Sequence, residues 1–367
     1  MADLSIHVLN AGVGESVVIG LPNRKWGVID CYASNLADPS SNPTMNFLRS
    51  QGVTELEFLC LTHPHWDHYR GLSHLLRSFK IRYFWRFGGF SRHDLKRVFL
   101  RFLKVSARAS EDRDLVEDAD ELTVSLSLAM RMKAKGEISD LFLLSDVKPL
   151  YPLPIGVDKD LEIKSIAPWS NNIERYQQDL AKCLDEHGRL VGKLDRQRHN
   201  DVSAAVSIRF GKARVILCGD VEVKNWIDTE ARLQRGELGA KAVKVSHHGS
   251  TTGYTPTLWA QFAAAQKPYA VVTPFRRFGL PKKEALEHIK ANTTVLMTTC
   301  RNATLDGEAH NFHFSRPRGL RTQAFLRGRF KGWIDSEPPK NIGICSMVFK
   351  KDGSCAHSCS GDACEMT

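Results

Sequence analysis

Hydrophobic and polar positions along the first sixty residues follow the spacing typical of β-strands. Apolar and polar residues alternate over 4–9, and short apolar runs follow at 16–21 and 26–30. A fourth apolar run, 56–61, comes after a short helical pattern at 45–52 that closes on glycine. The N-terminal region is therefore predicted to be rich in β-structure.

The rest of the chain shows both the helical and the strand spacing of apolar residues. A charged helical pattern covers about 91–138, and we interpret about 90–150 as a helical insertion. Strands are predicted at 161–166, 202–210, 213–217, 270–273 and 295–298, and helices at 228–235, 257–266 and 282–290. Strands and helices mixed over the whole length predict an α/β fold whose sheets are covered by helices.

Composition narrows the class of protein. The 367 residues are 42% hydrophobic and 25% charged, a balance that excludes a disordered, collagen-like or coiled-coil chain. No run approaches the ~18 apolar residues of a membrane span, and the first residues lack a secretory signal pattern. Several of the nine cysteines sit in apolar runs, as Cys60 and Cys218 do, which argues against a disulfide framework. We therefore expect a cytoplasmic protein that does not enter a membrane.

Positive charge is concentrated in two stretches of a chain whose formal net charge is +10. The first, 80–104, interleaves basic residues with aromatic ones, which fits either a nucleic-acid surface with stacking aromatics or solvated faces over an aromatic core. The second, 316–331, is basic and has no acidic residue. Such charges repel one another unless a partner neutralises them, so we interpret the second stretch as an anion-binding surface.

The strongest chemical signal lies directly after the strand predicted at 56–61. His63, His65, Asp67 and His68 fall within six residues. Imidazole nitrogen and carboxylate oxygen are the ligands that zinc, manganese and iron take in proteins, and so close a group can hold two ions. Without a cation these groups would repel or desolvate one another. A metal site is therefore predicted here.

Two further motifs end predicted strands in the same way. An apolar strand runs into Gly219 and Asp220, a carboxylate suited to bridging two metals. Another runs into His247 and His248, followed by a Gly-Ser turn. Together the three motifs predict a cluster of His and Asp side chains at one edge of a sheet.

These residues resemble the metallo-β-lactamase-fold hydrolases, whose HxHxDH signature corresponds to His63 through His68. More narrowly, the motifs at 12–16, 28–30, 61–65, 200–203, 219–220 and 246–250 resemble the hydrolase domain of bacterial competence (DNA-uptake) channel proteins. The resemblance implies a four-layer αβ/βα sandwich with two divalent transition-metal ions, zinc or manganese.

The resemblance also implies roles for single residues. His63 and His65 would hold one ion, Asp67 and His68 the other, and Asp220 would bridge them. One histidine of the pair at 247–248 completes the second site. We favour His248 as the ligand and His247 as the group facing the substrate, with the opposite assignment still open.

The chain departs from the family pattern at two places. Asn200, with His199 beside it, stands where many members have a further metal-binding histidine. A loop histidine of many relatives is also missing, and Arg276 or Arg277 is a candidate to replace it. Asp30 matches an aspartate that orders the metal-binding loop by hydrogen bonds.

The leading functional hypothesis is a phosphodiesterase or nuclease that acts on DNA or RNA through a metal-activated hydroxide. Asp67 and His247 are the candidate catalytic residues, and Arg276, Arg277, Arg318 and Arg321 the candidate substrate-binding ones. The alternatives are hydrolysis of a small ester, lactone or phosphocholine-type substrate, and a non-catalytic, metal-stabilised subunit that binds partners. Nucleic acid is the expected partner, with other proteins of a larger system as further candidates.

The domain organisation predicted from these patterns is a hydrolase domain at 1–300 and a basic C-terminal extension at 301–367. The extension ends in a tail that contains Cys345, Cys355, Cys359 and Cys364. Their spacing matches no familiar zinc motif, so a frayed tail with free thiols is expected, with a small zinc clip as the alternative.

Overall fold

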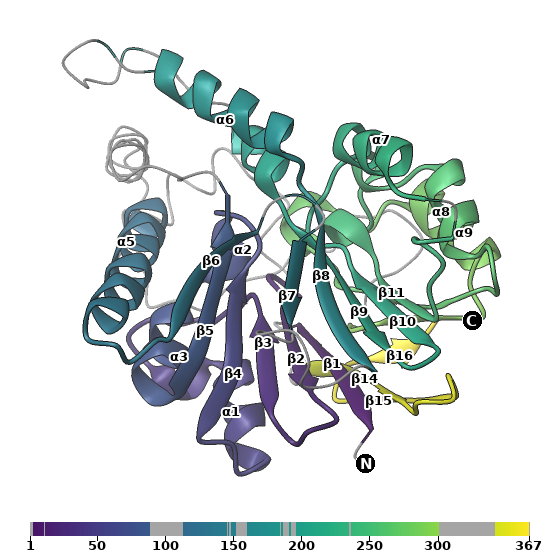
Figure 1. Ribbon diagram of the computed structural model, residues 1–367, viewed down its shortest axis with the longest axis horizontal. Coiled ribbons are helices and arrows are strands. Elements are labelled where there is room, and N and C mark those ends of the chain that lie inside the picture. The colour runs from purple at the N-terminus through teal and green to yellow at the C-terminus, as the bar shows by residue number, and fades with distance from the viewer. Residues whose placement is uncertain are drawn as a thin grey trace, which may run out of the picture.

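Two eight-stranded sheets lie face to face and carry helices on their outer faces (Figure 1). The computed structural model describes residues 3–10, 12–88, 113–144, 146, 148–151, 160–183, 185, 191, 196–234, 236–300 and 342–366. No helix within these residues is long and apolar enough to cross a membrane.

The first sheet has the strand order β15-β14-β1-β2-β3-β4-β5-β6. Its N-terminal strands are antiparallel, whereas β3, β4, β5 and β6 run parallel to one another. The strand bounds are β1 Leu4–Asn10, β2 Ser16–Gly20, β3 Trp26–Ile29, β4 Glu55–Leu61, β5 Lys80–Phe87, β6 Asp140–Leu144, β14 Gly343–Phe349 and β15 Cys355–Ser360.

The second sheet has the order β16-β13-β12-β11-β10-β9-β8-β7. Here β10, β11, β12 and β13 are parallel, so their carboxyl ends lie at one edge. The strand bounds are β7 Lys148–Tyr151, β8 Leu161–Ala167, β9 Ala205–Phe210, β10 Ala213–Leu217, β11 Ala242–Lys244, β12 Tyr269–Val272, β13 Val295–Thr298 and β16 Cys364–Glu365.

Three buried clusters divide the molecule into layers. One lies between the sheets, where inward residues such as Ile6 and Val215 meet. A second joins the first sheet to α1 (Pro43–Ser50), α3 (Leu72–Ser78), α5 (Arg113–Ala134) and α6 (Ser170–Lys182). A third joins the second sheet to α7 (Val223–Arg232), α8 (Pro256–Phe262) and α9 (Lys283–Ala291). The predicted four-layer α/β sandwich is confirmed.

Most predicted strands form close to their expected bounds, but the region interpreted as a helical insertion differs. The amphipathic helix α5 buries Leu122 and Leu126 in the same core as α3, and β6 extends the first sheet. The described part of 90–150 therefore completes the sandwich.

The aromatic residues at the start of the first basic stretch are core residues. They lie on β5, where Phe84, Trp85 and Phe87 are fully buried, and Trp85 stacks on Phe58 with ring centroids 4.2 Å apart. These side chains are not available to stack on nucleic-acid bases, so that interpretation is wrong for 83–87. The rest of the stretch, from 89, lies outside the described residues.

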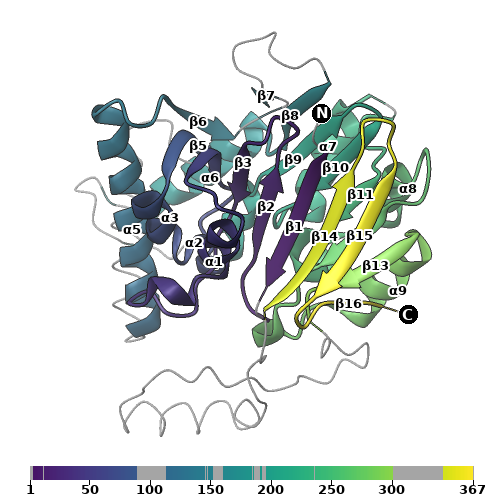
Figure 2. The same cartoon turned by 90° about the horizontal axis from the view of Figure 1, so that it is seen from below.

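The C-terminal cysteines lie in ordered strands, which corrects both the frayed tail and the boundary at 301. β14 pairs with β1 along its whole length, and β16 pairs with β13 of the second sheet. Figure 2 shows β14 and β15 lying beside β1. β14 alternates buried and partly exposed residues, so it contributes one face to the core between the sheets. Residues 343–365 are therefore part of the sandwich.

Candidate metal centre

The predicted metal motifs all follow the carboxyl ends of strands. Asp30 follows β3, the His63–His68 loop follows β4, Asp220 follows β10, and the His247–His248 pair follows β11. The parallel pairs β3–β4 and β10–β11 each place these ends at one edge of their sheet. A hydrogen bond from Ala204 N to Thr62 O (3.3 Å) ties the two edges together.

The first group of side chains contains His63, His65 and Asp220. His63 Nε2 lies 3.1 Å from His65 Nδ1 and 3.7 Å from Asp220 Oδ2. On the other side of the ring, His63 Nδ1 donates to Thr62 Oγ1 (3.0 Å), whose own hydroxyl donates to Asp30. Because Nδ1 carries the proton, Nε2 keeps its lone pair for a ligand inside the site.

The second group contains Asp67, His68, His248 and again Asp220. Asp67 Oδ2 lies 3.5 Å from His68 Nε2 and 3.2 Å from His248 Nε2. Asp220 reaches the same two nitrogens, with Oδ1 3.4 Å from His68 and Oδ2 3.6 Å from His248. Asp220 is thus the one side chain that faces both groups among the residues that the structure describes.

Hydrogen bonds from behind fix the orientation of both imidazoles in the second group. His68 Nδ1 donates to Asp30 Oδ2 (2.7 Å), and His248 Nδ1 donates to Thr273 O (2.9 Å). Each Nε2 therefore points into the cluster. Asp30 also accepts a hydrogen bond from Thr62 N (2.8 Å), so it orders the metal-binding loop by hydrogen bonds, as predicted.

The backbone decides which histidine of the pair enters the cluster. His247 and His248 both have positive φ, 47° and 53°, a conformation that costs non-glycine residues about 1–3 kcal/mol each. The His248 side chain is fully buried, whereas that of His247 is 21% exposed and its Nδ1 lies 3.0 Å from Thr252 Oγ1. This strained backbone thus directs the His248 ring into the buried cluster and the His247 ring towards Thr252.

A buried ion pair that was not predicted from the sequence supports the second group. Lys244 donates to Glu15, and Glu15 lies 3.8 Å from His68 Nδ1 and 3.7 Å from His248 Nδ1. Glu15 therefore approaches the Nδ1 sides, opposite to the side that Asp67 and Asp220 approach. A lysine in the otherwise apolar strand β11 was the available signal, because a buried ammonium needs a partner.

Glycine allows Glu15 to reach this position. Gly14 has φ 70°, and a Cβ there would collide with the Tyr32 ring. The next residue is held by a hydrogen bond from Glu15 N to Asp67 O (3.0 Å), and Thr273 Oγ1 donates to its carboxylate (2.7 Å). The turn at 12–16 thus holds the Glu15 carboxylate on the Nδ1 side of His68 and His248.

The chemistry of the cluster fits metal ions. His68 Nε2 and Asp220 Oδ1 are buried, and neither has a hydrogen-bond partner among the described residues. The carboxylates of Glu15, Asp30, Asp67 and Asp220 are all buried within this region, with Lys244 as the buried lysine beside them. Uncompensated buried charge is costly, and imidazole and carboxylate are ligands of zinc and manganese.

Electrostatics shift the pKa values of the candidate ligands in different directions in the metal-free protein. Burial, together with His68 and His65, lowers the pKa of His63 well below its usual range, so its imidazole is neutral. Burial opposes ionisation of Asp220, but His248 and His68 outweigh it and hold the pKa of this carboxyl well below its usual value. Burial also opposes the charge on His68, but Asp220 and Asp67 outweigh it and raise its pKa well above the usual value.

A sequence profile of the metallo-beta-lactamase superfamily matches residues 17–99, which include the His63–His68 loop. This part of the chain is therefore similar to the metallo-beta-lactamase superfamily. The two-sheet α/β architecture is consistent with the sandwich fold of this superfamily.

Two solved structures are among the structural matches of this chain. Zinc-bound PqqB from Methylobacterium extorquens is 14% identical, with 64% of this chain and 62% of that chain covered and a TM-score of 0.30. A diphosphatase of the PhnP family is 11% identical, with 74% of this chain and 86% of that chain covered and a TM-score of 0.34. This chain thus spans less than two thirds of the length of PqqB. No curated protein matches the sequence.

Asn200 and His199 lie at the rim of the candidate metal centre. Asn200 Nδ2 donates to Glu222 Oε1 (3.2 Å) and lies 3.4 Å from His247 Nε2, while its Oδ1 is buried and has no hydrogen-bond partner among the described residues. His199 Nδ1 lies 2.7 Å from the Tyr176 hydroxyl, and its ring contacts that of His65 edge-on. Glu222, which the sequence analysis did not single out, joins this rim.

Of the arginines predicted to bind substrate, the structure describes the side chain of Arg276 alone. Arg276 is buried and donates to Cys300 Sγ, and its backbone N donates to Gly12 O (3.3 Å). These contacts pack the 276 turn against the loop that carries Glu15. The side chain of Arg277, and all of Arg318 and Arg321, lie outside the described residues.

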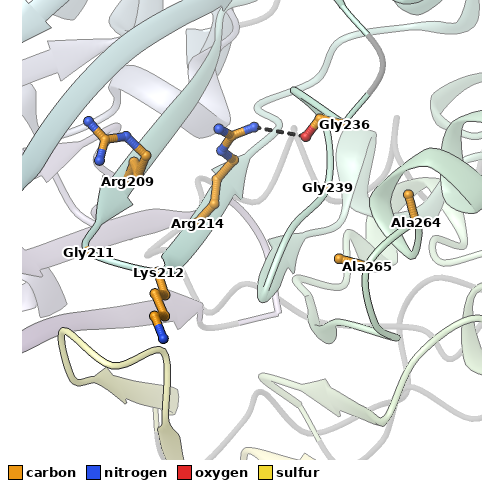
Figure 3. A pocket seen from close by; sticks show the side chains of 8 residues that line it. All are labelled: Arg209, Gly211, Lys212, Arg214, Gly236, Gly239, Ala264 and Ala265. Atoms are coloured by element: carbon orange, nitrogen blue, oxygen red, sulfur yellow. Dashed lines mark hydrogen bonds between the residues drawn. The ribbon is translucent and has the colours of Figure 1, made fainter.

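A pocket lies at the opposite end of the second sheet (Figure 3). Its lining includes Arg209, Lys212 and Arg214, near the β9–β10 turn, together with small glycine and alanine residues. Arg214, at the start of β10, donates to Gly236 O, whereas Asp220 follows the other end of that strand. This pocket is therefore separate from the metal cluster.

Proposed function

We propose that this chain is a metal-dependent phosphodiesterase that hydrolyses DNA or RNA. The observation that carries the proposal is the convergence of two His/Asp groups on Asp220, with buried His68 Nε2 and Asp220 Oδ1 left without hydrogen-bond partners among the described residues. His63, His65 and Asp220 would hold one ion, and Asp67, His68, His248 and Asp220 the other. Zinc and manganese suit this donor set.

The ions would lower the pKa of water and withdraw charge from the phosphoryl oxygens. The chain's own residues would orient the ligands, accept a proton and contact the substrate. Asp30 and Thr273 hold His68 and His248 by their Nδ1 atoms, so the Nε2 lone pairs stay directed inwards. The pKa of Asp67 is lowered because His68 and His248 outweigh the effect of burial, so this side chain is a carboxylate that can accept a proton.

His247 is the group we assign to the substrate. Its side chain is 21% exposed, while those of His63, His68 and His248 are fully buried, so it lies at the open side of the cluster. Glu222 Oε1 lies 3.5 Å from His247 Nδ1 and orients the ring. An imidazole N–H at this position can donate to an anionic oxygen as negative charge develops there.

A polynucleotide is the substrate class that agrees with the charge. The net charge of +10 and the basic stretch at 316–331, which has no acidic residue, favour a polyanion, and the motifs that resemble competence nucleases favour nucleic acid. A small ester would need neither feature. The proposal therefore assigns the metal cluster to bond cleavage and the basic stretch to phosphates outside it.

The decisive experiment measures binding and cleavage as functions of salt. Changing Arg318, Arg321, Arg327 and Arg329 together to Ala should weaken binding of labelled DNA or RNA. The slope of log affinity against log salt should flatten by about 0.7–0.9 for each phosphate that the variant no longer binds. Cleavage of a small chromogenic phosphodiester should change little, because it is too short to reach the stretch.

Other results would contradict the proposal. If neither DNA nor RNA is cleaved with zinc or manganese, while a small ester or lactone is, the chain is a small-ester hydrolase. Equal losses on the long and short substrates would assign a structural role to the four arginines. Unchanged affinity and slope would remove the basic stretch from substrate binding.

A further inference from the structure

The edge strand β15 carries a cysteine directly opposite a cysteine of β14. These two strands are antiparallel and in continuous register, and they lie at the edge of the first sheet (Figure 2). Residues 355, 357 and 359 are the partly buried positions of β15, which alternate with exposed ones. Their cross-strand partners pair Cys355 with Phe349, His357 with Met347, and Cys359 with Cys345.

The backbone geometry of this pair suits a disulfide. Directly opposed residues of antiparallel strands have Cα atoms about 4.5–5.5 Å apart and side chains on the same face. A disulfide needs Cα atoms about 4.4–6.8 Å apart, so no strand has to move to form one. Both side chains pack on the core between the sheets, with Cys345 fully buried and Cys359 half-buried. All nine cysteines are free thiols in this structure.

The two thiols have complementary chemistry. A hydrogen bond from Cys345 lowers the pKa of Cys359, whereas the same bond and burial raise the pKa of Cys345. Cys359 is therefore the better thiolate and the more exposed of the two, which makes it the nucleophile. Cys345 is the buried thiol held beside it.

We propose that Cys345 and Cys359 form a reversible cross-strand disulfide when the protein meets a hydroperoxide. The Cys359 thiolate attacks the peroxide oxygen, the O–O bond breaks, and a sulfenic acid forms as the other oxygen leaves as water or alcohol after taking a proton. The Cys345 sulfur then displaces hydroxide from the sulfenic sulfur, and its proton leaves with that hydroxide as water. The peroxide is reduced by two electrons, and the two thiols are oxidised to one disulfide.

Cys364 is the competing partner. It lies on β16 of the second sheet, close enough to Cys345 to raise its pKa by charge repulsion. It is not a cross-strand partner of Cys359, because its residue pairs with Thr298. The register therefore favours Cys345 over Cys364, and the disulfide would fasten the edge strand β15 to β14.

The test uses the full-length protein with one equivalent of hydrogen peroxide. Two of the nine thiols should be lost, and non-reducing peptide mapping should identify a peptide pair joined through Cys345 and Cys359. The melting temperature should rise and should return to its starting value with dithiothreitol, because the cross-link restricts the unfolded chain. Hydrolytic activity is not needed for any of these readouts.

Two matched variants on the same strand separate the proposal from general oxidation. Cys355→Ser should still lose two thiols and gain thermal stability, because its residue faces Phe349. Cys359→Ser should lose both effects. A cross-link mapped to Cys364, loss of the effect in Cys355→Ser, or an unchanged thiol count in the wild type would overturn the proposal, and so would protection of these thiols by a zinc ion bound to the tail.

Discussion

Lys244 and Glu15 form a buried ion pair directly behind the candidate metal centre. Both residues are nearly inaccessible to solvent, and the Lys244 ammonium also donates to Gly219 O (3.3 Å), next to Asp220. Burial opposes the charge on Lys244, but Glu15 and Asp220 outweigh it and raise its pKa. The Lys244 ammonium therefore stays charged, and its contact with Glu15 ties the turn at 12–16 in the first sheet to β11 of the second.

Removing one partner of this pair should be strongly destabilising. Lys244→Met leaves the Glu15 carboxylate buried without its cation, which should lower the free energy of unfolding by roughly 3–5 kcal/mol. Adding Glu15→Gln should restore part of the loss, because the uncompensated charge disappears. Chemical denaturation measures both, with Lys241→Met, a partly exposed position beside β11, as the control. A Lys244→Met protein as stable as the control would show that the pair is not needed.

The candidate ligands should be dispensable for folding but not for activity. His65→Ala and Asp67→Ala should abolish hydrolysis and reduce the bound metal from close to two ions per chain, while circular dichroism stays unchanged. His288→Ala, on the remote helix α9, is the control and should keep both metal and activity. Elemental analysis that finds no metal in the wild type, with unchanged activity in the variants, would refute the metal centre.

Asp220 should matter more than Asn200. Asp220→Asn removes a charge that faces both groups and should lower kcat/KM by more than about 100-fold. Asn200→Ala removes an amide that contacts Glu222 and His247 at the rim, so a loss of about 10-fold is expected. Steady-state kinetics on one substrate compare the two. Equal losses would mean that Asp220 does not bridge the two groups.

The stability of the metal-free protein should fall as pH rises. The folded-state pKa values of His68 and His248 are raised, because the facing carboxylates outweigh burial. Their contribution to stability is fully present below the unfolded value of about 6.5 and is lost as pH rises through the folded pKa, by up to about 1.4 kcal/mol per pH unit for each proton.

Metal should reverse this trend, because a ligand nitrogen must give up its proton. Melting temperatures of EDTA-treated and zinc-loaded protein, taken from about pH 6 to about pH 8.5, test both pH trends, that of the metal-free stability and that of the stabilisation by zinc. The metal-free curve should fall and the stabilisation by zinc should grow with pH. His288→Gln should change neither slope, whereas His248→Gln should flatten both. Parallel curves with and without zinc would argue against these two histidines as ligands.

The sequence by itself determined the chemistry of the candidate centre and most of the fold. Metal ligands are few in kind and closely spaced, so the His63–His68 loop, Asp220 and the 247–248 pair are visible as local patterns. Alternating and apolar runs located most strands for a similar reason, since burial of one face leaves a local period. Even so, local pattern did not separate core aromatics from surface ones on β5, because the successive residues Tyr83, Phe84 and Trp85 are buried on both faces of the strand and leave no alternation.

Only the tertiary structure decided the relationships between distant residues. Glu15 meets Lys244, and β14 pairs with β1, through contacts between segments far apart in the chain, which leave no local period. The choice between His247 and His248 depends on two positive φ angles that no pattern of residue types specifies. Residue types fix which chemistry is available, whereas packing between the sheets fixes which atoms meet.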